Sequence, residues 1–204
     1  MARSGITTRG EAVRQRIVES TGTLARERGL ANTSLDDIGD TAQVSRSQLF
    51  HYFPEGRESL LLAVLRYEAA QVLEDQDPFL HQLDSWEAWA AWRDLVVQRY
   101  AKQGSRCPMS VLISQLGSGS REASNEIVAE LLGEWARLIA AGVRSMQGTG
   151  EIIGDIDPAE GASTVLAAIQ GGVVLLMATG EIGHLEIALG QAIAGLGSSA
   201  RNPR

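Results

Sequence analysis

A short run of polar side chains behind Ser45 has the residue types that read the edges of base pairs. Arg46, Ser47 and Gln48 stand at the front of a brief predicted helix, which Pro54 must end because proline cannot continue a helix. Arginine can form two hydrogen bonds with guanine, and glutamine can form two with adenine. The sequence therefore predicts that these three side chains enter a major groove.

Other polar groups near this helix have the chemistry that binds phosphate. The hydroxyls of Thr33, Ser45 and Tyr52 and the guanidinium of Arg57 can hold a duplex in register without reading its sequence. His51 fits equally well as a DNA contact or as a plain helix-surface residue. The expected DNA contacts are Thr33, Ser45, Arg46, Ser47, Gln48, His51, Tyr52 and Arg57.

Two short predicted helices joined by a tight turn must position these groups. Thr33 is expected to cap the first helix, and Leu35 and Ile38 give that helix an inward apolar face. Ser45 is expected to cap the second helix, after a turn at residues 42–44. This arrangement is typical of a helix-turn-helix, whose second helix enters the major groove.

Apolar side chains are predicted to hold the second helix against the core. Leu49, Phe50 and Phe53 are expected to point inward. A preceding helix should end at Gly29, a residue suited to a left-handed helix cap, and a following helix should cover 57–73.

The stretch 33–60 resembles the N-terminal domain of the TetR family of regulators. The match runs without gaps through Thr33-Ser34, Ile38, Ala42, Val44-Ser45, Leu49, Tyr52-Phe53 and Leu60. The resemblance implies a homodimer with an all-helical body, usually a repressor that a ligand releases from DNA.

Four positions depart from the family's pattern. Ser47 replaces a glycine, Phe50 a tyrosine and Arg57 a lysine. Gln43 stands where the family has a turn glycine. If that turn needs a positive φ, glutamine costs about 1 kcal/mol there.

The rest of the chain reads as further helices without the alternating pattern of strands. The predicted fold class is all-α, with a helix-turn-helix domain at residues 1–56 and a helical ligand-binding and dimerisation domain at 57–204. The helices expected beyond residue 75 cover 86–103, 108–116, 121–146, 158–179 and 182–196.

Aromatic and methionine side chains crowd the second domain. Ligand sites are mostly apolar with few polar groups, so the crowding favours a cavity for a flat or hydrophobic effector, although each residue also suits a plain core. The candidate ligand residues are Trp86, Trp89, Trp92, Tyr100, Met109, Gln115, Trp135 and Gln170.

The predicted helix at 158–179 has an apolar stripe too wide to leave uncovered. Burial within one domain would cover it, and so would pairing with a second copy across a two-fold axis into a four-helix bundle, which we expect. The predicted dimer interface is Val165, Ile169, Gly172, Val173 and Leu176.

Charge is unevenly distributed along the chain. The net charge is −7 overall, about +1 over residues 1–66 and −8 over the remainder. DNA contact confined to the N-terminal part fits this asymmetry, because the acidic body would be repelled by phosphate.

Composition argues against several other classes. The single cysteine, Cys107, excludes an intramolecular disulfide and a thiolate zinc cluster, and no histidine lies near it in sequence for a cysteine enzyme. We expect no apolar run to reach the ~20 residues of a membrane span, and the N-terminus lacks a secretory pattern. We therefore expect a cytoplasmic protein with no catalytic residues, metal, cofactor or membrane partner.

Together these features predict a ligand-responsive regulator of transcription. It would bind a double-stranded DNA operator as a homodimer and be released by a small apolar effector. The alternatives are a DNA-binding regulator without an effector and a cysteine-dependent enzyme.

Overall fold

The computed structural model describes residues 8–29, 32–104, 109, 113–114, 116–152 and 156–198, and its regular elements within these ranges are all helical. This confirms the predicted all-α class. The elements are α1 Thr8–Arg28, α2 Leu35–Ala42, α3 Arg46–Tyr52, α4 Arg57–Glu74, η2 Phe79–His81, α5 Trp86–Gln103, η3 Ser118–Ser120, α7 Arg121–Thr149, α8 Pro158–Thr179 and α9 Gly183–Ser198.

The helices group into two units, and both units are discontinuous in sequence. The first, here called the head, combines residues 1–71 with 108–128, and the second, the body, combines 72–107 with 129–204. Helices α4 and α7 each contribute to both units. Most of α4, which begins just beyond the predicted boundary between residues 56 and 57, groups with the head.

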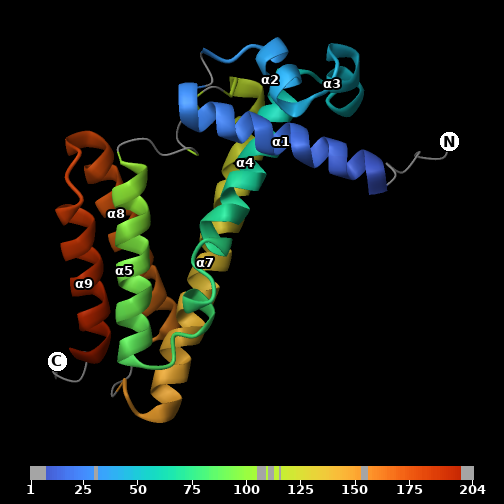
Figure 1. Ribbon diagram of the computed structural model, residues 1–204. Coiled ribbons are helices and arrows are strands. Elements are labelled where there is room, and N and C mark those ends of the chain that lie inside the picture. Colours follow the sequence, from blue (N-terminus) through green and yellow to red (C-terminus); the bar gives the residue numbers. More distant parts are fainter. Residues whose placement is uncertain are drawn as a thin grey trace. The chain divides into compact units, whose positions relative to one another are not determined.

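In the head, α1, α2 and α3 pack together around an apolar centre (Figure 1). Ile17, Ile38 and Leu49 are at most 1% exposed. Arg16 on α1 donates from Nε to the carbonyl oxygen of Ala42 at 2.7 Å. That bond satisfies a carbonyl at the end of α2 and fixes α1 beside the turn that leads into α3.

A buried ion pair ties α1 to α4. Glu68 is 6% exposed, and its carboxylate accepts a hydrogen bond from Arg26. Gly22 makes room for this pair, because a Cβ at that position would lie 2.7 Å from the Glu68 Oε1. A buried carboxylate needs such a partner, so the pair constrains how α4 packs on α1.

Helix α2 begins one residue later than predicted. Ser34, not Thr33, is its N-cap: the Ser34 hydroxyl accepts from the Asp37 N–H at 3.1 Å, and the Ser34 N–H donates to Asp37 Oδ2 at 2.8 Å. Thr33 is 4% exposed and donates its hydroxyl to the Gly29 carbonyl at 3.0 Å. The predicted cap at Thr33 was wrong because that hydroxyl faces inward to the end of α1.

The turn between α2 and α3 requires a left-handed residue, as suspected. Gln43 has φ 53° and ψ 48°, and its N–H donates to the Asp40 carbonyl at 3.2 Å. Gly39 completes the turn, because a Cβ there would lie 2.9 Å from the Val44 carbonyl oxygen. The structure thus places a glutamine in a backbone conformation that glycine adopts without strain.

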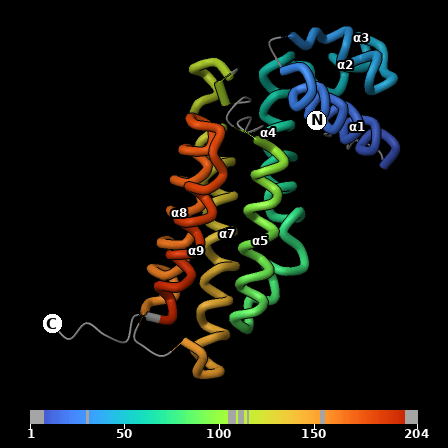
Figure 2. Tube along the Cα trace, turned by 60° about the vertical axis from the view of Figure 1, so that its left-hand side comes forward, coloured from blue at the N-terminus to red at the C-terminus, as the bar shows by residue number. Residues whose placement is uncertain are grey.

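In the body, α5, α8 and α9 lie side by side, with α8 and α9 joined by a short turn (Figures 1 and 2). The two last helices approach closely at Gly172, where a Cβ would lie 2.5 Å from the Leu185 Cα. The predicted bounds of α5 and α8 are confirmed to the residue. A single apolar core joins α5, α7, α8 and α9.

Helix α8 is more apolar than the sequence reading allowed. It has 22 residues, and its best 18-residue window has a mean hydropathy of 1.7, enough by length and composition alone to cross a membrane. The buried core helix of a globular protein meets the same criterion. Within the chain, 39% of that window is buried, and one face of α8 belongs to the core.

Candidate functional site

The front of α3 is held by a reciprocal pair of hydrogen bonds. The Ser45 hydroxyl accepts from the Gln48 N–H at 3.2 Å, and the Ser45 N–H donates to Gln48 Oε1 at 2.9 Å. This confirms Ser45 as the N-cap. Pairing with adenine needs both the oxygen and the nitrogen of a glutamine side chain, and here the oxygen is engaged. Gln48 therefore keeps its amide donors for DNA, while its oxygen already accepts one bond from the backbone of the same helix.

Arg46 and Ser47 lie exposed at the start of the same helix. The Arg46 side chain is 65% exposed, and its Nη1 lies 3.7 Å from the Asp36 Oδ1 on α2. Such an exposed, long pair is weak, so it leaves the guanidinium free to exchange its partner for DNA. The Ser47 hydroxyl lies 3.0 Å from that of Ser45.

Phe50 does not point into the core. It is 40% exposed, whereas Leu49 and Phe53 are 1% and 2% exposed. The predicted inward position of Phe50 was wrong because Leu49 and Phe53 already fill the core side of this seven-residue helix. The Arg14 guanidinium lies over the Phe53 ring, 5.1 Å from the ring centroid.

The predicted phosphate contacts differ in their surroundings. His51 is exposed and meets the half-buried Tyr52 edge-on, with ring centroids 5.1 Å apart. Arg57 is half-buried and donates from Nη1 to the Thr33 carbonyl oxygen at 3.1 Å. Because the Thr33 hydroxyl is buried and bonded to Gly29, it is not a surface donor for phosphate.

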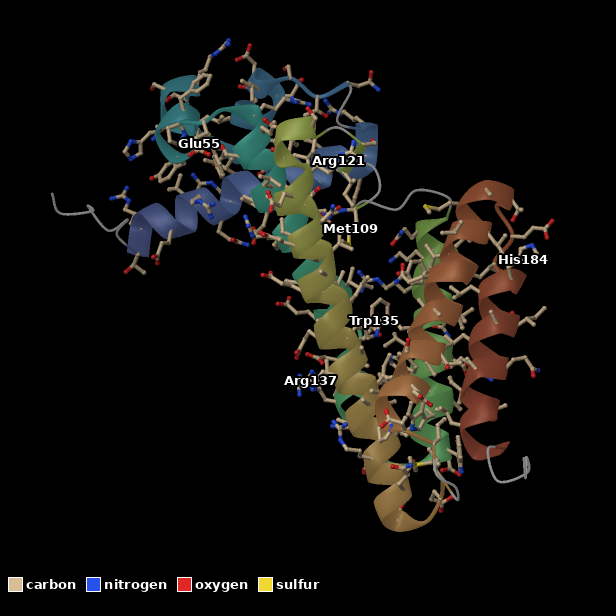
Figure 3. All side chains as sticks on the ribbon, turned by 180° about the vertical axis from the view of Figure 1, so that it is seen from behind. Glu55, Met109, Arg121, Trp135, Arg137 and His184 are labelled. Carbon is tan, nitrogen blue, oxygen red and sulfur yellow. The ribbon has the colours of Figure 1, made fainter. Side chains whose placement is uncertain are left out.

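The predicted ligand residues of the body form part of its core. Trp89, Trp92 and Trp135 are at most 1% exposed, and Tyr100 is 9% exposed. Trp89 meets Trp92 edge-on, at a centroid distance of 5.8 Å. Figure 3 shows Trp135 on the side of α7 that faces α5 and α8. The structure thus gathers these aromatic residues from two helices.

The indole N–H groups of these tryptophans differ in one respect. Trp92 Nε1 donates to Gln76 Oε1 at 2.8 Å, and Gln76, 2% exposed, donates in turn to the Val72 carbonyl at 2.6 Å. The buried N–H groups of Trp89 and Trp135 have no hydrogen-bond partner among the residues that the structure describes. Sequence reasoning missed Gln76, because it reads as part of the helix break at 75–78.

The remaining candidates are less central. Trp86 packs against the core while half-buried, and Met109 and Gln170 are also half-buried. Gln115 and Cys107 lie outside the described residues. Within the described ranges, no group of three or more His, Cys, Asp or Glu side chains is placed to hold a metal ion.

The predicted dimer residues lie on the face of α8 that packs into its own chain. All five residues are buried within the single chain, where this apolar stripe packs into the body core. These residues thus contribute to the core of their own chain. The five residues are Val165, Ile169, Gly172, Val173 and Leu176. The opposite face instead exposes Val174 by 58% and Leu175 by 46%, and α9 exposes Ile187 by 68%.

Known proteins resemble this chain in its N-terminal sequence and in its fold. Residues 17–64 match the sequence profile of the family described as bacterial regulatory proteins, tetR family. An uncharacterized HTH-type transcriptional regulator of Mycobacterium tuberculosis is 26% identical over 137 residues, which are 62% of this chain and 67% of that protein.

Solved structures of similar fold cover nearly the whole chain. The TetR-family transcriptional regulator of Cytophaga hutchinsonii has a TM-score of 0.74 at 19% identity, over 98% of this chain and 100% of that chain. The SmeT–triclosan complex has a TM-score of 0.65 at 16% identity, over 95% and 98% of the two chains. Residues 17–64 therefore match the DNA-binding domain of the tetR family, and the chain as a whole has the fold of solved TetR-family regulators.

Proposed function

We propose that the protein is a homodimeric transcriptional repressor that binds a double-stranded DNA operator through α3 and releases it when a small apolar effector binds the body. The observation that carries the DNA-binding part is the exposed front of α3. There Arg46 and Ser47 are exposed on a helix whose first turn is fixed by the Ser45–Gln48 bonds. A groove reader needs this combination of a rigid backbone and free side chains.

An effector site in the body is supported by its two unpaired indole donors. A buried N–H without an acceptor costs about 1–3 kcal/mol, so such groups are rare unless a ligand or a water satisfies them. Trp89 and Trp135 both carry one. We therefore infer an effector with a flat apolar body and a hydrogen-bond acceptor. A protein of this fold, SmeT, has been solved in complex with triclosan.

The homodimer is supported by three large apolar side chains that α8 and α9 leave exposed, Val174, Leu175 and Ile187. Large apolar side chains exposed together mark surfaces that another molecule covers. Two copies of this helix pair would bury the face as a four-helix bundle across a two-fold axis. A lipid membrane would also cover such a face, but we propose a cytoplasmic dimer.

The first experiment is selection of DNA from a random duplex pool by the purified protein. We expect one sequence to be enriched, with two-fold related halves, because each copy would present one α3 to the duplex. Enrichment of no sequence over the starting pool would sink the proposal.

The second experiment follows operator release by filter binding while compounds are titrated. Each probe is used as a pair, an aromatic ketone or phenol and its hydrocarbon isostere. The acceptor-bearing member should release the operator at lower concentration, and Trp89→Phe or Trp135→Phe should narrow the difference within the pair. A regulator without an effector would keep its operator in the presence of both members.

A further inference from the structure

One aromatic ring interrupts the polar surface at the front of α3. Phe50 is 40% exposed, and it follows the exposed Arg46 by four residues and Ser47 by three. Side chains with these spacings are neighbours on a helix surface. The ring therefore lies beside the two side chains best placed to enter a groove.

The packing of the head does not account for the position of this ring. Leu49 and Phe53 fill the core side of α3 at 1% and 2% exposure. An exposed phenyl ring also carries a hydration cost that a polar residue at the same position would avoid. A group that covers the ring on binding would recover that cost.

The chemistry of the major groove supplies one such group. Among the base edges that face this groove, the C5-methyl group of thymine is the apolar one. Phosphates are less suited to Phe50, because its ring has no hydrogen-bond donor to offer them. Gln48, two residues before Phe50, is also less free to recognise a base, because its Oε1 already accepts from the Ser45 N–H.

We propose that Phe50 packs against the C5-methyl group of a thymine next to the base that Arg46 contacts, and so sets the preference for thymine at one position in each half-site. This inference rests on the proposed function, in which α3 enters the major groove. In this proposal Phe50 performs part of the base recognition that we expected of Gln48 from the sequence.

The test replaces each thymine of the selected operator in turn by deoxyuridine, which differs only by the lost methyl group. Wild-type protein should lose about fourfold in affinity at one symmetric position, the value of one buried methyl group. Phe50→Ala should bind the thymine and deoxyuridine duplexes equally. Phe50→Tyr, which keeps the ring, should retain the preference for thymine.

Control variants separate this contact from a general loss of the helix. Glu55→Ala changes an exposed side chain just beyond α3 that has no assigned DNA contact, and it should keep the thymine preference. The thermal midpoint of Phe50→Ala should stay near that of wild type, because the ring is not part of the core.

Two results would overturn the inference. One is an operator that tolerates deoxyuridine at every thymine, and the other is a thymine preference that survives in Phe50→Ala. Both results leave the proposed function standing, since they presuppose a selected operator. Failure to select any operator would instead count against the proposed function itself.

Discussion

Gln48 and Ser45 hold each other at the start of α3, with the Gln48 Oε1 accepting at 2.9 Å from the Ser45 N–H and the Ser45 hydroxyl accepting at 3.2 Å from the Gln48 N–H. The side chain that looks most like an adenine reader thus also fixes the geometry of the helix that would carry the readers.

This pair predicts that Gln48→Ala acts through stability. Loss of its half of the capping box should lower the free energy of unfolding by about 1 kcal/mol. Gln48→Glu should preserve it, because a glutamate at this position accepts the same bond. Urea unfolding of the three proteins measures the difference. If Gln48→Ala is as stable as wild type but has a relaxed preference at one base pair, Gln48 acts by contacting a base and not by capping the helix.

Arg46→Ala should weaken binding to the selected operator by about 1–3 kcal/mol and relax the preference at one base pair. Asp36→Asn is the matched variant, because it removes the partner that lies 3.7 Å from Arg46. Its affinity should equal or exceed that of wild type, because the competing negative charge is gone. Binding curves against single-site operator variants provide the measurement, and an unchanged profile for Arg46→Ala would place the readers elsewhere.

Gln43→Gly should stabilise the protein by about 0.5–1 kcal/mol, because glycine adopts the left-handed conformation at this turn without the strain of a Cβ. Gln43→Ala retains the Cβ and should bring no such gain. The comparison needs only the two thermal midpoints. A midpoint for Gln43→Gly below that of Gln43→Ala would contradict the account of the turn.

Asp37 should make stability depend on acid pH. The hydrogen bond from the Ser34 hydroxyl, at 2.6 Å, and that from the Ser34 backbone hold the pKa of Asp37 below its ordinary value of 3.8. The carboxylate therefore contributes stability above about pH 3.8, and this contribution is lost as the pH falls through the lowered folded pKa. Asp37→Asn should be less stable than wild type at neutral pH, and the gap should close in acid. Asp36→Asn, which leaves the capping box intact, is the control.

The exposed and buried faces of α8 should respond differently to charge. Leu175→Glu and Ile187→Glu place a carboxylate on the exposed face, so they should give folded monomers with weakened operator binding. Val173→Glu buries a charge in the core at a position 5% exposed, so it should unfold the body instead. Light scattering and circular dichroism distinguish the two outcomes. Dimers of native size in both surface variants would locate the interface on another face.

Much of the helical fold could be predicted because its signals are local. Asp157 and Pro158 mark the start of α8, Gly180 marks its end, and Ser45 marks the start of α3. The unusual backbone at Gln43 could also be anticipated, since the resembling family has glycine there. Each of these features depends on residues close in sequence.

The errors arose where two neighbouring residues have the same chemistry. Thr33 and Ser34 both carry a hydroxyl, and the spacing from Ser34 to Asp37 was the available sign of the true cap. On α8, Val173 and Val174 are alike in sequence but differ in exposure, 5% against 58%. A helix apolar on every side does not reveal which face its own chain covers.

The candidate site could be predicted in outline but not in its partners. The polar front of α3 is evident from residue types, whereas the engagement of the Gln48 oxygen depends on a rotamer. Phe50 lies in a helix of seven residues, too short for its apolar period to indicate a face. The bond from Trp92 to Gln76 joins residues 16 apart across a turn, beyond the reach of local patterns.

The distribution of indole rings makes the body optically distinct from the head. All four tryptophans, Trp86, Trp89, Trp92 and Trp135, belong to the body, while Tyr52 and Tyr67 lie in the head. Tryptophan fluorescence therefore reports on the body alone. The three buried rings should emit at shorter wavelength than an indole exposed to water. Unfolding confined to the head would leave that signal unchanged, so indole emission follows the body by itself.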